Sequence, residues 1–226
     1  MSNGAKMLIL GLDGADWRVL KPLMEAGKVP NLQRLYKDGT TAPLNSTMPP
    51  MTLPSWSSML TGCNPGKHGI FDFVVKDPKK WALEFSNATH RMVPTLHEIL
   101  SGRGGRVASI AVPTTWPPSE VNGVMVSGCD SPVSTGIDGS FCHPTELYAE
   151  LLSRFGGLRF ADFQESDIYD GWHHETLHLM KKEIKRKSAI ASWLLQQERW
   201  DCFMLLFGES DTVSHHFWMF YDENSP

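Results

Sequence analysis

Side chains that commonly bind divalent cations follow directly after apolar runs near both ends of the chain. Asp13 follows the first of these runs, and Asp211 and His215 follow the last one, which ends at Phe207. Carboxylate oxygens and imidazole nitrogens are frequent ligands of zinc and similar ions. Asp211 and His215 have the i, i+4 spacing that places two side chains on one helix face, where they can bind a single cation. The alternative is that Asp211 only caps that helix while His215 packs beside Trp218.

The Thr52 hydroxyl is placed close to the expected start of a helix. The proline-rich segment that precedes it reads as a stiff turn, and Pro54 suits the first turn of the helix. Backbone N–H groups and the helix dipole favour an anion at such a start, so a phosphate can bind there. No general base neighbours Thr52 in the sequence, so nucleophilic attack would need metal coordination to lower its pKa. The alternative role of Thr52 is a helix N-cap.

The elements that must position these residues alternate between apolar strands and amphipathic helices. Buried strands are predicted over Lys6–Leu12, Arg106–Val112, Gly123–Ser127 and Asp201–Phe207, with a return to the sheet at 40–47. Helices are predicted after Asp16 as far as Gly27, from Pro30 to Gly39, after Thr52 as far as Gly62, over Val93–Leu100, from His143 with Leu147, Leu151 and Leu152 inward, and over Glu175–Gln197. This alternation predicts an α/β fold with a doubly wound, mostly parallel sheet and flanking helices. Asp13 and the 209–216 segment are then expected at one edge of the sheet, where α/β proteins bind ligands.

Composition narrows the classes of protein that fit. The 226 residues are 41% hydrophobic with a net charge of −4, and 21 Lys and Arg against 25 Asp and Glu leave no basic excess for nucleic acid. The apolar runs are far shorter than the roughly 20 residues of a membrane span, and no signal peptide is visible, so a cytoplasmic protein is predicted. The four cysteines are widely spaced, which favours reduced thiols. One domain over 1–226 is expected, with a cap or insertion at about 130–180 that holds no sheet strand.

Several motifs, in order along the chain, resemble the type I phosphodiesterase and nucleotide pyrophosphatase family of the alkaline phosphatase superfamily. They are Leu8–Gly14, Val29–Leu35, Met51–Ser55, Leu60–Gly62, Pro65 with His68–Ile70, and Ser210–His215. The segments Val112–Pro118 and Val121–Gly128 resemble the uncharacterised prokaryotic branch of that superfamily. The order of the motifs is more specific than any one of them.

The resemblance implies a metal-dependent phosphodiesterase that acts on a small-molecule phosphate ester. It implies that Thr52 is the nucleophile and becomes phosphothreonine. It also implies two divalent metal ions, usually zinc with manganese as the alternative: Asp13 and Thr52 would bind one ion, and Asp211 and His215 the other.

Family members complete these two sites with an Asp-His pair and a further His downstream of the last motif. Those three ligands are missing from this chain, which stops at Pro226. We therefore expect an N-terminal portion of a longer protein, which holds half of each metal site and is inactive as given. His173, His174 and His178 are the candidates to substitute, since His174 and His178 share a helical face. They are weak candidates, because the lysines around them indicate a solvated face.

Two rival classes of function stay open. A phosphomonoesterase or a phosphomutase of the same superfamily would use the same metal sites, although such phosphomutases generally use serine. A non-catalytic module that binds a phosphorylated ligand would explain the missing ligands. A sulfatase is disfavoured because Thr52 and Trp56 replace the formylglycine precursor and the arginine of the sulfatase signature. Lys67 and His68 are expected on a surface loop, with an approach to the substrate as the alternative.

Overall fold

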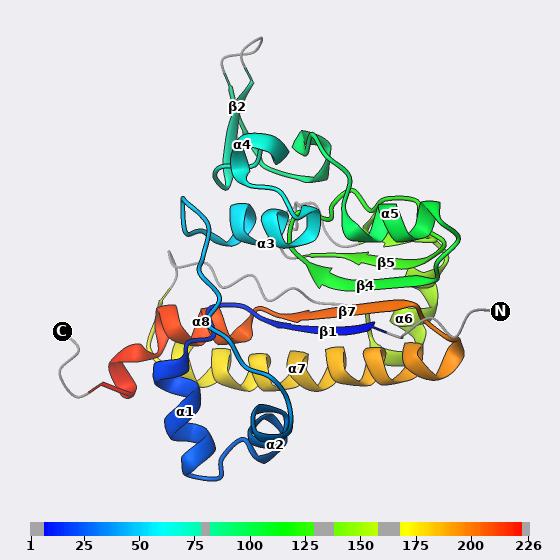
Figure 1. Cartoon of the computed structure of the whole chain (residues 1–226). Coiled ribbons are helices and arrows are strands. Elements are labelled where there is room, and N and C mark those ends of the chain that lie inside the picture. Colours follow the sequence, from blue (N-terminus) through cyan, green and yellow to red (C-terminus); the bar gives the residue numbers. More distant parts are fainter. Residues whose placement is uncertain (1–6, 78–81, 129–137, 158–167, 223–226) are drawn as a thin grey trace. The chain divides into compact units, whose positions relative to one another are not determined.

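The computed structural model describes residues 7–77, 82–128, 138–157 and 168–222. The chain divides into two compact units (Figure 1). The larger unit takes in Met1–Gly11 and Thr47–Phe207, and the smaller unit takes in Leu12–Ser46 and Gly208–Pro226. The sheet belongs to the larger unit, whereas the smaller unit is built from helices near the two ends of the sequence.

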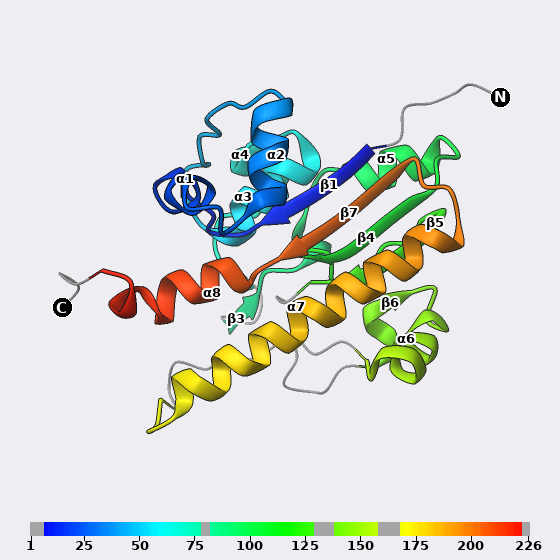
Figure 2. The ribbon, with the colours of Figure 1, turned by 90° about the horizontal axis from the view of Figure 1, so that it is seen from below.

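The central sheet has five strands in the order β1-β7-β4-β5-β6. Their bounds are Met7–Leu12 (β1), Val107–Val112 (β4), Gly123–Ser127 (β5), Cys142–His143 (β6) and Cys202–Phe207 (β7). β4 pairs in parallel with both β5 and β7, and Figure 2 shows β1 and β7 pointing the same way. The two-residue β6 pairs antiparallel with β5. The predicted mostly parallel α/β sheet is therefore confirmed.

Strand β7 distributes its side chains between two helical layers. Phe203 and Leu205 enter the cluster formed with α6 (Leu147–Phe155) and α7 (Trp172–Gln197). Met204 and Leu206 pack on the opposite side, against Leu60 of α3 (Thr52–Thr61). This alternation follows from the two-residue period of a strand. In Figure 1, α3 and α7 accordingly lie on opposite faces of the sheet.

The other elements of the larger unit are short. They are α4 (Pro65–His68), the antiparallel pair β2 (Val74–Asp77) and β3 (Ala82–Phe85), α5 (Leu96–Gly102), and 3-10 turns at Ala88–His90 and Gly139–Phe141. The smaller unit contains α1 (Trp17–Glu25), α2 (Pro30–Asp38), α8 (Glu209–His216) and a 3-10 turn at Trp218–Phe220. Within it, the Trp17 and Tyr36 rings meet edge to face at 5.5 Å and join α1 to α2.

The structure differs from the sequence-based predictions in several elements. Residues 40–47 form no strand, and Pro43 there has no N–H to donate to a sheet. The helix predicted from Val93 begins at Leu96 instead, because Thr95 and Glu98 form a capping box. Leu152 was expected inward but is 49% exposed. The strand expected to be buried over Lys6–Leu12 forms as β1, but as an edge strand of the sheet it leaves most of its side chains exposed.

The predicted cap region holds a further difference. β6 adds a sheet strand inside it, where none was expected, and β2 and β3 form in a stretch that shows no readable period. Residues 129–137, which include Cys129, and 158–167 of this region lie outside the described residues. Of the other three cysteines, none is in a disulfide. The single-domain boundary with a cap therefore stays a prediction.

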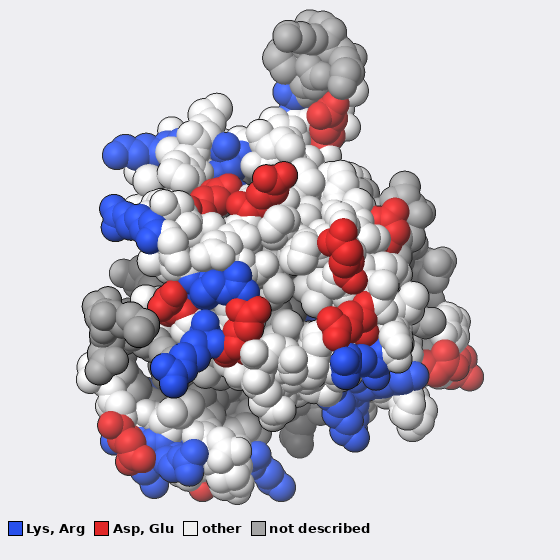
Figure 3. Space-filling view, turned by 90° about the vertical axis from the view of Figure 1, so that its right-hand side faces the viewer, with Lys and Arg blue, Asp and Glu red and all other residues white. Residues whose placement is uncertain are grey.

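Charges on the face shown in Figure 3 are mixed, since basic and acidic side chains alternate across it. A face with mixed charges produces no extended positive electrostatic potential that would attract a polyanion such as nucleic acid. In the part of the chain that the structure describes, no helix is long and apolar enough to cross a membrane.

Candidate active site

Thr52 is the first residue of α3 and belongs to the larger unit. The N-cap is Met51, which has extended dihedrals and a side chain that makes no capping hydrogen bond. The N-cap role considered for Thr52 is therefore wrong. Ser55 N–H donates to the Met51 carbonyl, and Pro54 has no N–H, so the N–H groups of Thr52 and Leu53 have no acceptor within the helix. These two donors make the helix start suitable for an anion.

The Thr52 side chain itself is half-buried. Within the described residues, its hydroxyl takes part in no hydrogen bond. A hydroxyl that is used neither as a cap nor in a side-chain pair is available to a ligand. This is the property that a nucleophile requires.

Buried hydrogen bonds hold α3 in position behind Thr52. The Ser57 hydroxyl lies 3.0 Å from the Thr114 hydroxyl, and the Thr114 hydroxyl donates to the Pro113 carbonyl. Ser57 is therefore the donor of the first bond, and both side chains are fully buried. The residue after the helix, Gly62, adopts a left-handed φ of 65°, which ends α3 without a Cβ clash.

His68 makes a second connection to α3. It is fully buried, and its Nδ1 accepts the Ile70 N–H, so its Nε2 carries the hydrogen that faces the Ser58 hydroxyl at 2.9 Å. Burial and the Arg91 charge lower the pKa of His68, against an opposing effect of the Pro54 carbonyl. The surface-loop expectation is wrong for His68, because Pro65 and His68 of α4 are buried, whereas Lys67 is exposed.

Arg91 is a buried cation next to this network. Its side chain is 4% exposed, donates to the Thr114 carbonyl at 2.6 Å and lies 3.8 Å from a carboxylate oxygen of Glu98. Thr114 has a φ of 58°, an uncommon value for a residue with a branched side chain. Burial opposes ionisation of Glu98, but hydrogen bonds from Thr95 and Ser119 and the Arg91 charge hold its pKa below the usual range.

His97, the residue before Glu98, is a buried group that the candidate site does not use. It is fully buried in α5, and neither ring nitrogen has a hydrogen-bond partner within the described residues. Burial lowers its pKa to about 4, although the Glu98 charge raises it and the Arg91 charge lowers it. The ring is therefore neutral at physiological pH.

Asp13 and Asp211 come together in the smaller unit. The Ser210 hydroxyl donates to the Asp13 carbonyl at 2.5 Å. Gly14 has a φ of 64°, and a Cβ on it would lie 2.9 Å from both Cα and a carboxylate oxygen of Asp211. Only glycine allows this close approach, so the 13–14 turn rests directly on the first turn of α8.

Asp211 and His215 share one face of α8, as their spacing predicts. His215 Nε2 lies 3.6 Å from Asp211 Oδ1, and the side chains are 64% and 35% exposed. Donors of a tetrahedral zinc ion are about 3.4 Å apart, so the pair fits two positions of one site.

Further ligands would be needed to complete a zinc site, because such a site takes at least three protein ligands. Within the described residues, no group of three or more His, Cys, Asp or Glu side chains is close enough to hold a metal ion. His174 and His178 of α7, the weak substitutes, are no exception. Of the predicted set, the structure joins Asp13, Asp211 and His215 in one unit and places Thr52 in the other.

The polar residues that support α3 were not predicted from the sequence. No local pattern around Arg91 or Thr114 indicates that they are buried, and in the helix with Ser57 and Ser58 only the apolar positions were used for the prediction. The available signal was weak: two serines on a helix expected to pack against a sheet.

Comparisons with known proteins agree with this architecture. The chain matches the family described as type I phosphodiesterase / nucleotide pyrophosphatase over residues 7–225. Phosphonoacetate hydrolase from Sinorhizobium meliloti 1021, solved with phosphonoformate, has a TM-score of 0.65 and 21% identity, and the match covers 94% of this chain and 48% of that chain. The murine ectonucleotide pyrophosphatase / phosphodiesterase 5 has a TM-score of 0.56 and 14% identity, and the match covers 93% and 45% of the two chains.

These matches also show how much of the neighbours' length this chain covers. The chain spans about half the length of the solved structures it resembles. No functionally curated protein matches it. The structural neighbours share the alkaline phosphatase-like fold, and the family match extends over nearly the whole sequence. The chain therefore belongs to the type I phosphodiesterase / nucleotide pyrophosphatase family.

Proposed function

We propose that the whole protein is a metal-dependent phosphoric ester hydrolase of the phosphodiesterase type, with Thr52 as its nucleophile. The observation that carries the proposal is the Thr52 hydroxyl, which has no hydrogen-bond partner within the described residues and sits at an uncapped helix start. Family membership supports the reaction class. The activity is proposed for the whole protein because this chain spans about half the length of its structural neighbours.

The reaction proceeds in two displacements at phosphorus. The Thr52 oxygen bonds to phosphorus as the bond to the leaving alkoxide or aryloxide breaks, and the hydroxyl proton passes to solvent, which also protonates an alkoxide leaving group. Water then attacks the phosphothreonine, which releases a phosphate monoester and restores the Thr52 hydroxyl. The N–H groups of Thr52 and Leu53 orient the phosphoryl oxygens through both steps.

The protein would hold two divalent cations, zinc or manganese, through its carboxylate, imidazole and hydroxyl groups. Asp13 and Thr52 would bind one, and Asp211 and His215 the other; the 3.6 Å spacing on α8 supports the second pair, and the contact of the 13–14 turn with Asp211 supports a place for Asp13 close to it. When bound, the pair of ions lowers the pKa of the threonine hydroxyl and neutralises the phosphoryl oxygens.

A module that only binds phosphate esters is the second candidate. The absence of a three-ligand group within the described residues favours it. It predicts phosphate binding at the start of α3 without turnover.

The deciding experiment uses the whole protein and bis(4-nitrophenyl) phosphate, after chelation and re-addition of zinc or manganese. Thr52→Ala should lower the metal-restored rate by at least about 10³-fold, because no other nucleophile replaces it. Thr41→Ala, at an exposed position outside helices and strands, is the matched control and should leave the rate unchanged. Absence of turnover with either metal would move the proposal to the binding module.

A further inference from the structure

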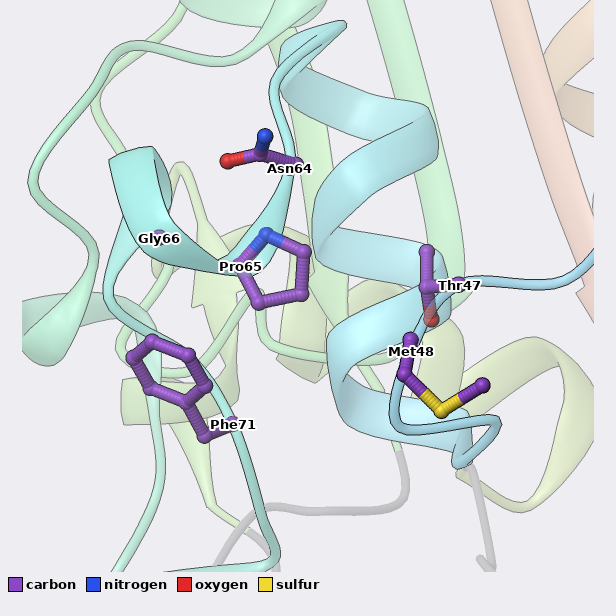
Figure 4. A pocket seen from close by; sticks show the side chains of 6 residues that line it. All are labelled: Thr47, Met48, Asn64, Pro65, Gly66 and Phe71. Atoms are coloured by element: carbon purple, nitrogen blue, oxygen red, sulfur yellow. The ribbon is translucent and has the colours of Figure 1, made fainter.

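A pocket of about 380 Å³ lies beside α3 in the larger unit (Figure 4). Its lining comes from the segment before the helix and from the segment after it: Thr47, Met48, Asn64, Pro65, Gly66 and Phe71. The volume lies within the range of small-molecule sites, which is roughly 300–1,000 Å³. In Figure 4 Met48 lies beside the start of α3, and Phe71 lies on the opposite side of Pro65, away from the helix.

A hydrogen bond connects the wall of this pocket to the first turn of α3. The Thr47 hydroxyl donates to the Pro49 carbonyl at 2.8 Å and lies 2.9 Å from the Ser55 hydroxyl. Ser55 is three residues after Thr52, so both side chains point from the same helix face, about 4.5 Å apart along the axis. The pocket wall is therefore about one helical turn from the proposed nucleophile.

The residues that line the pocket favour an uncharged group of the substrate over a charged one. None of the six residues is ionisable, so a further phosphate group of a substrate would find no counter-charge there. Met48 and Phe71 are 82% and 53% exposed, so both pocket walls present apolar surface to water. An apolar group bound in the pocket would remove part of this surface from water.

The position of Phe71 is set by a buried neighbour. Ile70 is 1% exposed, and its N–H donates to the buried His68 ring. Phe71 thus projects from a fixed backbone, which suits a side chain that forms one wall of a site.

We propose that this pocket binds an uncharged, apolar ester group, aryl or alkyl, of the phosphate ester that Thr52 attacks. The proposal rests on the proposed function and narrows its substrate class. It favours phosphodiesters with an apolar substituent over nucleotide pyrophosphates, whose second phosphate is charged.

The test compares two diesters with the same leaving group, phenyl 4-nitrophenyl phosphate and methyl 4-nitrophenyl phosphate, on the metal-loaded whole protein. The wild type should prefer the phenyl ester in kcat/KM by about tenfold or more. Phe71→Ala should lower kcat/KM for the phenyl ester much more than for the methyl ester and so remove most of this preference. Phe85→Ala is the matched control, because Phe85 is 70% exposed on β3 and outside the pocket.

A second variant fills the pocket instead of opening it. Gly66 has no positive φ, and the nearest atom to a Cβ there is Asn64 Oδ1 at 3.4 Å, so the backbone accepts a side chain at this position, and Gly66→Phe adds bulk to the pocket lining. It should lower kcat/KM for the phenyl ester only. An unchanged ester preference in both Phe71→Ala and Gly66→Phe would overturn the inference while the proposed function stands.

A binding measurement separates the two possible failures. If neither ester is hydrolysed, the proposed function fails, and diphenyl phosphate and dimethyl phosphate are titrated by calorimetry as non-reacting probes. Tighter binding of diphenyl phosphate that Phe71→Ala weakens about tenfold would retain the pocket as an apolar ligand site. Equal binding of the two probes would reject it.

Discussion

The start of α3 and the start of α8 both carry candidate site residues, but the protein supports them differently. Behind Thr52, a network of fully buried hydroxyls and a buried cation holds α3 against the sheet. Around Asp211 and His215, the side chains are 35% and 64% exposed, and the closest support is the backbone of the 13–14 turn. The proposed nucleophile is thus held by packing in the larger unit, whereas a bound ion would be needed to fix the proposed metal ligands.

The largest expected loss of stability comes from removing the buried cation. Arg91→Met leaves the Thr114 carbonyl and the Glu98 carboxylate without their charged partner, and should lower the free energy of unfolding by about 3 kcal/mol. Urea unfolding at neutral pH measures it. Arg154→Met, which removes an exposed ion pair with Glu150, is the control and should cost less than about 1 kcal/mol. Equal losses of unfolding free energy in the two variants would show that the buried position of Arg91 adds nothing to stability.

The buried imidazole of His97 predicts a pH dependence. Its pKa is about 4 in the folded protein and 6.5 when unfolded, so the unfolded chain binds a proton first as the pH falls. Stability is full above about pH 6.5 and decreases down to about pH 4. Between pH 7 and pH 5 the loss should be about 2 kcal/mol. His97→Leu should remove that part of the loss, measured as the difference between urea midpoints at the two pH values in each protein.

Loss of a buried hydroxyl donor should have a smaller effect. Ser57→Ala leaves the Thr114 hydroxyl without its donor and should lower stability by about 1–2 kcal/mol. Ser214→Ala removes an exposed serine that donates to a helix carbonyl of α8 and should change stability by less than about 0.5 kcal/mol. A larger loss of stability in Ser214→Ala than in Ser57→Ala would contradict the conclusion that side-chain hydrogen bonds stabilise α3 more than α8.

The smallest stability effect should accompany a large effect on metal binding. His215→Ala changes an exposed side chain and should alter the unfolding free energy by less than about 0.5 kcal/mol. In the whole protein it should weaken zinc binding by more than about 100-fold, measured by competition with a chelator. His216→Ala, the adjacent histidine of α8, is the control. Similar zinc affinities for both variants would argue against His215 as a ligand.

The sequence was sufficient to locate the central strands of the sheet and the start of α3. β4 and β7 are buried on both faces, so their apolar runs are visible without any tertiary knowledge. The i, i+4 spacing of Asp211 and His215 is likewise a local property, and the 3.6 Å separation of their side chains follows from it.

What could not be predicted depends on contacts between distant segments. Arg91 and Thr114 meet across 23 positions of sequence, and Ser57 and Thr114 across 57. Neither polarity nor period indicates such pairs in advance, because a buried serine and an exposed serine look alike in the sequence. The short strand β6 was not predicted for a similar reason, because two residues at the edge of a sheet are too few to show an alternating pattern.

The bond from Ser210 to the Asp13 carbonyl spans 197 positions of the chain, so it also bears on the order of folding. Closing a loop of that length carries an entropic cost of about 4.7 kcal/mol, apart from a constant term. The larger unit reduces this cost, because β1 and β7 are neighbours in its sheet and lead directly into the 13–14 turn and α8. Asp211 is made long after Asp13, and β7 directly precedes α8 in the chain. We therefore expect β1 and β7 to pair before the bond between Ser210 and Asp13 forms.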